Sequence, residues 1–179
     1  GKVATQTAEK LGIATQMTDG RRITDGPMLE VVTMVYGGLV NKQIVARLQA
    51  FGCNALGLTG ADARIITATK RPVREIDYGF AGDIAQVDAA RLLAFLNTGL
   101  TPVLAPLTAD LNGQLLNTNA DTIASATATA LARQGAEVRL VYCFEKPGVL
   151  LDPDNDGSVI AEISPTYYAR LKADGVVSK

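Results

Sequence analysis

Hydrophobic and polar positions along the chain follow a helical period in several separate stretches. Residues 3–11 carry apolar or small side chains at helical spacing and stop at Gly12, as is usual just past a helix end. A second helix is predicted to start at Pro27, behind a Thr or Asp cap, and to be interrupted at Gly37 and Gly38. The period then resumes in further stretches: 39–50, 89–96, 120–133 and 166–173, the last capped at Ser164-Pro165.

Short, nearly continuous apolar runs lie between these helices and predict strands: 53–58, 65–68, 78–87, 102–106 and a buried strand at 138–143. Two hairpins are indicated, one over 13–24 with a turn at Thr18-Asp19-Gly20, the other at Asn112-Gly113. Helices alternating with such strands are typical of an α/β fold. The prediction is a three-layer αβα sandwich on a largely parallel open sheet with β-hairpins.

Composition narrows the class of protein. The chain has 179 residues, 47% of them hydrophobic, which suits a single domain over residues 1–179. The absence of an apolar run of about 18 residues argues against a membrane span. With 17 Lys and Arg against 18 Asp and Glu, the net charge is −1, so neither nucleic acid nor an anionic membrane is an expected partner.

The chain has no histidine, which excludes Ser-His-Asp and Cys-His nucleophile systems and His-ligated metals. Its two cysteines, Cys53 and Cys143, stand in strand-like contexts and are expected to be reduced core thiols of a cytoplasmic protein. No metal-ligating cluster is predicted. Any chemistry must therefore use Asp, Glu, Lys, Arg, Asn and backbone amides.

The run Asn117-Thr-Asn119-Ala-Asp121 is the first candidate site. In an extended segment, Asn117 and Asn119 project to the same side, while Asp121 falls in the first turn of the following helix. The amides could then hold a polar ligand and the carboxylate could orient cations. The structural alternative is that Asn119 or Asp121 only caps the helix.

Arg22, in the first hairpin, is the second candidate, because an arginine can clamp a carboxylate through two parallel hydrogen bonds. The alternative is a solvated surface arginine. Gly1, at the start of the first helix, would let backbone N–H groups approach an anion. The loop over residues 145–150 follows a predicted strand and could lie beside a ligand or simply connect elements. The apolar stripe over residues 27–50 could be core or a subunit interface.

Eight motifs, in order, resemble those of the amino-acid kinase superfamily and, within it, the N-acetyl-L-glutamate kinases. They are Gly1-Lys2, Gly20-Arg-Arg22-Ile-Thr-Asp25, Gly38-Leu-Val-Asn-Lys42, Leu56-Gly-Leu-Thr-Gly60-Ala-Asp62, Gly79-Phe-Ala-Gly82, Pro102-Val-Leu-Ala-Pro106, Asn117-Thr-Asn-Ala-Asp121 and Pro147-Gly-Val-Leu150. The resemblance covers essentially the whole chain. It implies the amino-acid kinase fold and transfer of the ATP γ-phosphate to the γ-carboxylate of an N-acylated L-glutamate, in arginine biosynthesis.

The same resemblance implies roles for the candidate residues. Arg22 would bind the substrate's α-carboxylate, and Asn117, with Asn119 beside it, would hydrogen-bond the substrate. Gly1 would present its amide to the reacting groups, and Asp121 would organise the lysines around the phosphoryl group. The nucleotide would lie along Glu145, Lys146, Pro147, Gly148, Val149 and Leu150. ATP and Mg²⁺ are the implied cofactors, N-acetylglutamate or N-succinylglutamate the substrate, and a homodimer through the helices of residues 27–50 the assembly.

The resemblance also implies a chain truncated at both ends. The family's first strand, with its glycine-rich loop and one phosphate-binding lysine, would precede Gly1, and a second such lysine would follow residue 179. Residues 1–120 would form the acylglutamate-binding part, and 121–179 the start of the nucleotide-binding part. The 179 residues alone are then expected to show little kinase activity. The alternatives are a catalytically inactive amino-acid-binding or oligomerising fragment, or another amino-acid kinase.

Overall fold

A computed structural model describes residues 1–18, 20–143 and 145–177 of the chain. The chain divides into two compact units, Gly1–Leu140 and Val141–Lys179, called here the first and second units. Asp19, part of the turn predicted at residues 18–20, lies outside the described residues. The expectation of a single domain with a functional division near residue 120 stays a prediction.

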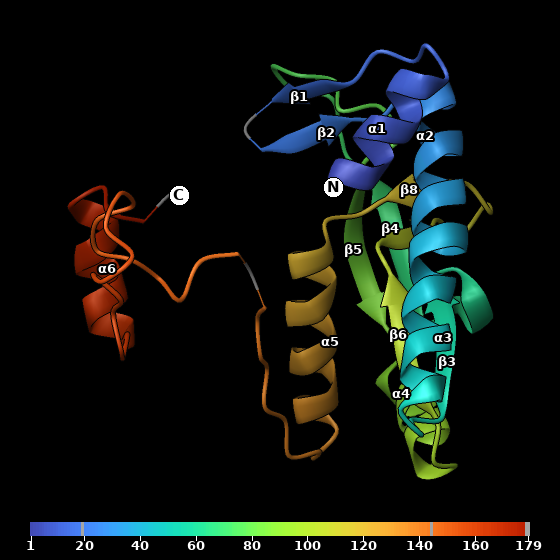
Figure 1. Cartoon of the computed structure of the whole chain (residues 1–179). Coiled ribbons are helices and arrows are strands. Elements are labelled where there is room, and N and C mark those ends of the chain that lie inside the picture. The colour runs from blue at the N-terminus through green and yellow to red at the C-terminus, as the bar shows by residue number, and fades with distance from the viewer. Residues whose placement is uncertain (19, 144, 178–179) are drawn as a thin grey trace. The chain divides into compact units, whose positions relative to one another are not determined.

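Helices alternate with strands in the first unit, and most of these elements are labelled in Figure 1. The helices are α1 (Lys2–Lys10), α2 (Gly26–Val32), the π-helix η1 (Thr33–Val40), α3 (Asn41–Ala50), the 3-10 turn η2 (Asp62–Arg64), α4 (Ala89–Asn97) and α5 (Ala120–Arg133). The strands are β1 (Gln16–Thr18), β2 (Arg21–Ile23), β3 (Ala55–Thr59), β4 (Ile66–Lys70), β5 (Gly82–Val87), β6 (Thr101–Ala105), β7 (Leu107–Ala109) and β8 (Leu115–Asn117). The second unit contains α6 (Pro165–Ala173), which Ser164 caps as predicted through the Tyr167 amide.

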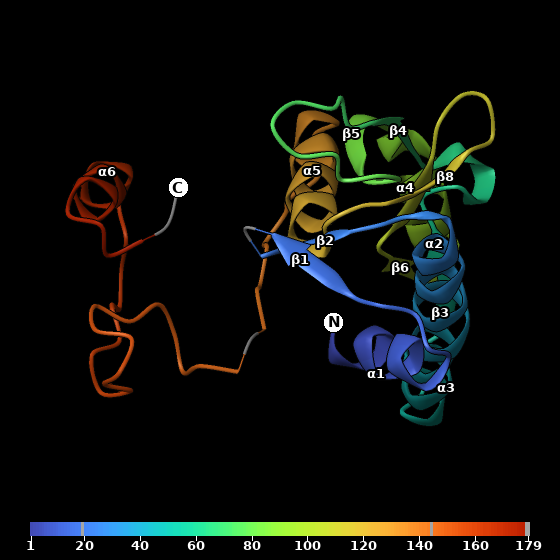
Figure 2. The ribbon, with the colours of Figure 1, turned by 90° about the horizontal axis from the view of Figure 1, so that it is seen from above.

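The described strands form three sheets: β1–β2, β3–β6 and the four-stranded β5–β4–β7–β8. β3 runs parallel to β6, with Ala55 opposite Thr101, and β4 runs parallel to β7, with Thr67 opposite Ala109. Antiparallel pairing joins β4 to β5, β7 to β8 and β1 to β2. α3 contacts β3 and β6, whereas α4 contacts β6 and α5 contacts β5. Figures 1 and 2 show α3 and α5 on opposite sides of these strands, so the predicted α/β layers are confirmed.

Two apolar clusters form the core of the part of the chain that the structure describes. One joins α1, α2 and η1 to β7 and contains Ala4, Ala8, Met28, Val31, Val32, Val35 and Leu107. The other lies between β4, α4 and α5 and contains Ile65, Ile66, Leu92 and Ile123. The apolar stripe of α2 is therefore core, the more ordinary of its two interpretations.

The predicted break at Gly37 and Gly38 is wrong, because helical structure continues through η1 from α2 into α3. A β-carbon on Gly37 would lie 3.2 Å from Leu107 Cδ1 and 3.7 Å from Thr59 Cγ2. This glycine lets the helix approach the strands closely and does not end it.

The buried strand predicted at residues 138–143 is also wrong. These residues are exposed and have no regular secondary structure, with Val141 69% exposed. Apolar composition favours a strand only where a neighbouring strand supplies hydrogen bonds, and none of the described strands pairs with this segment. Cys143 is accordingly exposed rather than in the core, while Cys53 is half-buried, and both are free thiols. Among the described residues, no helix is long and apolar enough to cross a membrane.

Candidate functional site

A cavity of about 390 Å³ opens in the first unit where several strands end. The hairpin β1–β2, the start of α1, the ends of β6 and β8, the segment before β5 and the N-terminus of α5 all contribute to its walls. Ligands of open α/β sheets bind beyond the carboxyl ends of strands, so the position fits a binding site. Four predicted site residues line it together: Gly1, Arg22, Asn117 and Asn119.

Arg22 is buried at the cavity wall, with only 8% of its surface exposed. Its Nη2 donates to Thr5 Oγ1 at 2.9 Å and to the Gly1 carbonyl oxygen at 3.5 Å, and its Nη1 donates to Thr15 Oγ1 at 3.2 Å. No described carboxylate forms an ion pair with it. A buried guanidinium held only by neutral acceptors favours an anion, which excludes the surface-arginine interpretation.

Asn117 is tied to the hairpin through Thr24. The Thr24 hydroxyl donates to the Arg22 carbonyl oxygen at 3.3 Å, so Thr24 Oγ1 must accept from the other side. That acceptance comes from Asn117 Nδ2 at 3.0 Å, and it fixes the orientation of the amide. Asn117 Oδ1 has no hydrogen-bond partner among the described residues, and the residue lines the cavity.

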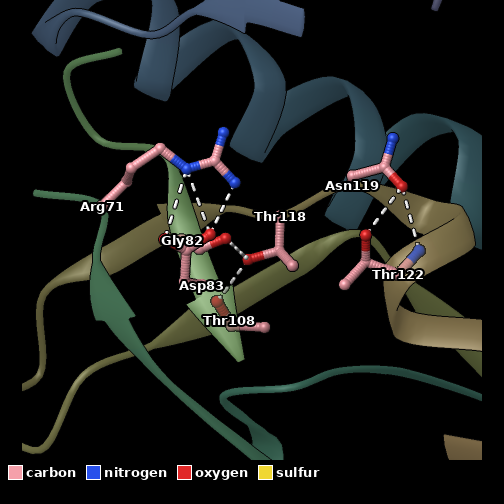
Figure 3. Close-up of polar contacts among 7 residues, drawn as sticks. All are labelled: Arg71, Gly82, Asp83, Thr108, Thr118, Asn119 and Thr122. Carbon is pink, nitrogen blue, oxygen red and sulfur yellow. Dashed lines mark hydrogen bonds and ion pairs between the residues drawn. The ribbon is translucent and has the colours of Figure 1, made fainter. Parts of the chain in front are cut away.

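Asn119 caps the N-terminus of α5, which was the alternative to a ligand-binding role in the sequence analysis. Its Oδ1 accepts from the Thr122 amide at 2.9 Å and from Thr122 Oγ1 at 3.1 Å (Figure 3). The capping does not remove Asn119 from the cavity, which it still lines beside the positive end of the helix. Asp121 lies in the first turn of α5, is exposed, and is not part of the cavity wall.

Arg71, which shares a basic stretch of the sequence with Lys70 and Arg74, also lines the cavity. Its Nε donates to both carboxylate oxygens of Asp83, at 3.1 and 3.3 Å, and its Nη2 donates to Asp83 Oδ1 at 2.5 Å (Figure 3). The guanidinium also lies over the ring of Tyr78, 5.3 Å from its centroid. The hydrogen bond with Asp83 raises the pKa of Arg71 above its ordinary value, so the residue is permanently cationic.

Two buried threonines lie behind this wall. Thr108 Oγ1 and Thr118 Oγ1 are 2.8 Å apart, and Thr118 Oγ1 is 3.5 Å from the Gly82 carbonyl oxygen (Figure 3). A β-carbon on Gly82 would lie 2.5 Å from Thr118 Oγ1, so only glycine permits this approach. The threonine pair thereby fixes the start of β5 against the end of β8.

Among the described residues, the charged side chains on the cavity wall are those of Arg21, Arg22 and Arg71. Tyr36 and Asn41, which sequence reasoning also missed, complete the polar lining from η1 and α3. The arrangement suits a small ligand with more than one negative charge.

The predicted nucleotide residues, Glu145 to Leu150, lie in the second unit. Lys146 pairs with Asp156 at 2.8 Å, and Leu150 is buried and forms a β-bridge with Val159. These contacts hold a compact loop, and the role of the six residues stays a prediction. Within the described residues, no three carboxylate or thiol side chains are grouped so as to hold a metal ion.

Comparison with known proteins identifies the family. A sequence profile of the Amino acid kinase family matches residues 1–179, and the chain belongs to that family. It is 58% identical over 177 residues to the acetylglutamate kinase of Bacteroides thetaiotaomicron, a match that covers 99% of this chain and 68% of the relative. Over 182 residues it is 39% identical to the acetylglutamate kinase of Methanopyrus kandleri, covering 99% of this chain and 72% of that protein. The family predicted from the residue motifs is confirmed.

Solved structures agree on the fold. The crystal structure of smu.665 from Streptococcus mutans UA159 superposes with a TM-score of 0.85 at 24% identity, covering 99% of this chain and 69% of that one. N-acetylglutamate synthase from Neisseria gonorrhoeae, complexed with coenzyme A and N-acetyl-glutamate, gives a TM-score of 0.63 at 23% identity, covering 73% of this chain and 30% of that one. At these identities the likeness shows the fold alone.

Proposed function

We propose that the protein binds an N-acylated L-glutamate in the arginine-lined cavity and phosphorylates its γ-carboxylate with ATP, as a step of arginine biosynthesis. The observation that carries this proposal is the buried Arg22, whose guanidinium has no acidic partner among the described residues. Relatives at 58% and 39% identity named acetylglutamate kinase support the substrate and the reaction.

The substrate fits the polar groups of the cavity. Arg22 takes the α-carboxylate, because a guanidinium binds a carboxylate through two parallel hydrogen bonds. Asn117 Oδ1, which faces no donor among the described residues, accepts from the amide N–H of the N-acylated glutamate. The γ-carboxylate then extends toward Gly1, at the start of α1.

ATP supplies the phosphoryl group, and Mg²⁺ would arrive with the nucleotide, since the described residues offer no metal-binding cluster of their own. Such a transfer depends on positioning and charge neutralisation and needs no histidine. In this proposal, Asp121 orders cationic groups from the first turn of α5, and residues 145–150 contact the nucleotide. The enzyme acts in the cytoplasm as a homodimer, for which the exposed Met34 and Leu39 of η1 are candidate interface residues.

The experiment is calorimetric titration of N-acetylglutamate into the protein and into Arg22→Lys and Arg22→Met variants. Loss of a charge-assisted bidentate contact costs about 2–3 kcal/mol, so affinity should fall roughly 30- to 150-fold in Arg22→Met. Arg47→Met is the matched control, because Arg47 is exposed on α3 and lies outside the cavity. Circular dichroism verifies that each variant is folded.

A hydroxylamine trap for the acyl phosphate, run with ATP on the same samples, tests the chemical step. Product that depends on Arg22 supports the proposed reaction. Binding without product is the result expected of these 179 residues alone, and the amino-acid-binding alternative predicts it too. If the Arg22 variants bind N-acetylglutamate as tightly as the parent, the site assignment is wrong.

A further inference from the structure

Tyr36 connects the hydrophobic core to the cavity. Its side chain packs against the apolar cluster of α1, α2 and η1, and the residue also lines the cavity. The hydroxyl lies at the Gly1 end of the cavity, because it contacts the Gly1 nitrogen. A tyrosine whose ring is held by the core presents its O–H from a fixed position, so little conformational entropy is lost when a ligand binds there.

The π-helical segment η1 keeps Tyr36 in this position. Helical structure continues through η1 between α2 and α3 (Figure 1). The next residue, Gly37, allows a close approach, since a β-carbon there would lie 3.2 Å from Leu107 Cδ1. η1 therefore packs directly against β7, and it also contacts α1. π-Helical turns within helices are frequent at functional sites, so the location favours a role for the residue that η1 contributes to the cavity.

The hydroxyl of Tyr36 accepts one hydrogen bond and has a proton to donate. The Gly1 nitrogen is the donor in their contact, at 2.9 Å, so the O–H bond of Tyr36 points away from it. No described residue accepts the Tyr36 proton. A ligand in the cavity can therefore accept it.

Gly1 places this donor relative to Arg22. Arg22 Nη2 donates to the Gly1 carbonyl oxygen at 3.5 Å, while Tyr36 Oη accepts from the nitrogen of the same residue. In the proposed function, Arg22 takes the α-carboxylate and the γ-carboxylate extends toward Gly1. The Tyr36 hydroxyl is thus the side-chain donor at the end of the cavity that the γ-carboxylate approaches.

A neutral donor suits the carboxylate that reacts. A guanidinium engages both oxygens of a carboxylate and neutralises its charge, whereas one phenol O–H engages a single oxygen. The other oxygen can then form the bond to the γ-phosphorus of ATP, and ADP leaves with the electron pair of the broken P–O bond. We propose that Tyr36 binds the γ-carboxylate of the substrate through its hydroxyl. The proposal rests on the proposed function and adds the residue that selects a glutamate side chain over an apolar one.

Two ligands isolate this carboxylate. N-acetylglutamate carries it, and N-acetylnorvaline has a methyl group in its place on a side chain of the same length. Calorimetric titration into the parent protein is expected to show tighter binding of N-acetylglutamate. In Tyr36→Phe the ratio of the two affinities should fall about tenfold or more, because a hydrogen bond to a charged acceptor is lost. The affinity for N-acetylnorvaline should not change.

Tyr168→Phe is the matched control, because Tyr168 is 46% exposed on α6 and belongs to the second unit. It removes the same hydroxyl group and should leave the ratio of the two affinities unchanged. A purely structural role of the Tyr36 hydroxyl, or a contact with the α-carboxylate, would weaken the binding of both ligands by the same factor in Tyr36→Phe. The ratio would then equal that of the parent protein.

An unchanged ratio in Tyr36→Phe would overturn this inference, and so would an equal affinity of the parent protein for the two ligands. In either case, Arg22-dependent binding of N-acetylglutamate would leave the proposed substrate site standing. If the parent protein binds neither ligand, the proposed function itself fails, and this inference fails with it.

Discussion

Asn117 and Thr24 are 93 residues apart in sequence, yet Asn117 Nδ2 donates to Thr24 Oγ1 at 3.0 Å. This contact joins the end of β8 to the residue that follows β2, and Thr24 passes the connection to the Arg22 backbone. Arg22, proposed to bind the α-carboxylate, and Asn117, proposed to accept from the amide N–H, are therefore fixed relative to each other by the buried hydroxyl of Thr24.

Removing that hydroxyl should cost stability. Thr24 is fully buried, so Thr24→Val would leave the Asn117 amide and the Arg22 carbonyl without this partner. We expect the free energy of unfolding to fall by about 1–3 kcal/mol, measured by urea denaturation. Thr24→Ser keeps the hydroxyl and is expected to retain most of the stability. A valine variant as stable as the parent would show that the hydrogen bonds of the Thr24 hydroxyl contribute nothing to the free energy of unfolding.

Gly79 forms the other side of the same junction. It has φ +64°, and a β-carbon there would overlap the carbonyl oxygen of Thr24. Gly79→Ala should therefore destabilise the fold by more than the roughly 1–2 kcal/mol that positive φ alone costs an L-residue. Gly12→Ala is the matched control, because Gly12 has φ +71° and a β-carbon there would meet no heavy atom within 4 Å. Equal loss of stability in the two variants would argue against the close approach.

The sequence alone identifies site residues whose chemical role can be predicted without knowing their partners in the fold. Arg22 and Asn117 are candidates because a hairpin arginine and a strand-end amide suit a polar ligand, and the structure brings both to one cavity. Arg71 stands out in the sequence only as a member of a basic loop. Its significance depends on Asp83, 12 residues away on another strand, and no spacing rule reveals that pairing.

The fold is predictable where local patterns decide the structure and is not where tertiary contacts decide it. Helix caps at Asn119 and Ser164 follow from local hydrogen bonds and are predicted correctly, although for Asn119 capping is one of two interpretations. From its neighbours in sequence, Gly37 is predicted to break the helix. The reason for a glycine there is its close contact with Leu107, which is distant in sequence and cannot be predicted from local patterns. Residues 138–143 have the composition of a strand but no pairing partner among the described strands.

The turn after β3 contains backbone strain that a substitution can relieve. Ala63 has φ 49° and ψ 20°, a left-handed conformation that β-carbons disfavour. Ala63→Gly should raise the free energy of unfolding by up to about 1 kcal/mol, equivalent to a rise of about 2–4 °C in Tm. Ala61→Gly, where φ is −70°, should lower the free energy by about 0.5–1 kcal/mol. A fall in Tm for Ala63→Gly would contradict the claim that the backbone at Ala63 is strained.

Because the cavity is lined by arginines, we predict that its affinity for an anionic ligand depends on salt concentration. Among the described residues, its charged wall residues are Arg21, Arg22 and Arg71, and Arg71 is paired with Asp83. Arg21 therefore adds to the attraction that Arg22 exerts on an anionic ligand. Raising ionic strength from about 0.01 M to 1 M shortens the Debye length from about 30 Å to about 3 Å and screens the exposed part of that attraction. N-acetylglutamate, with two carboxylates, should lose several-fold in affinity over this range, measured by titration calorimetry. N-acetylglutamine keeps the α-carboxylate for Arg22 but has a neutral side chain, so its affinity should fall less steeply. Identical salt dependence for the two ligands would mean that the cavity senses only the α-carboxylate, and the γ-carboxylate would then lie outside the field of these arginines.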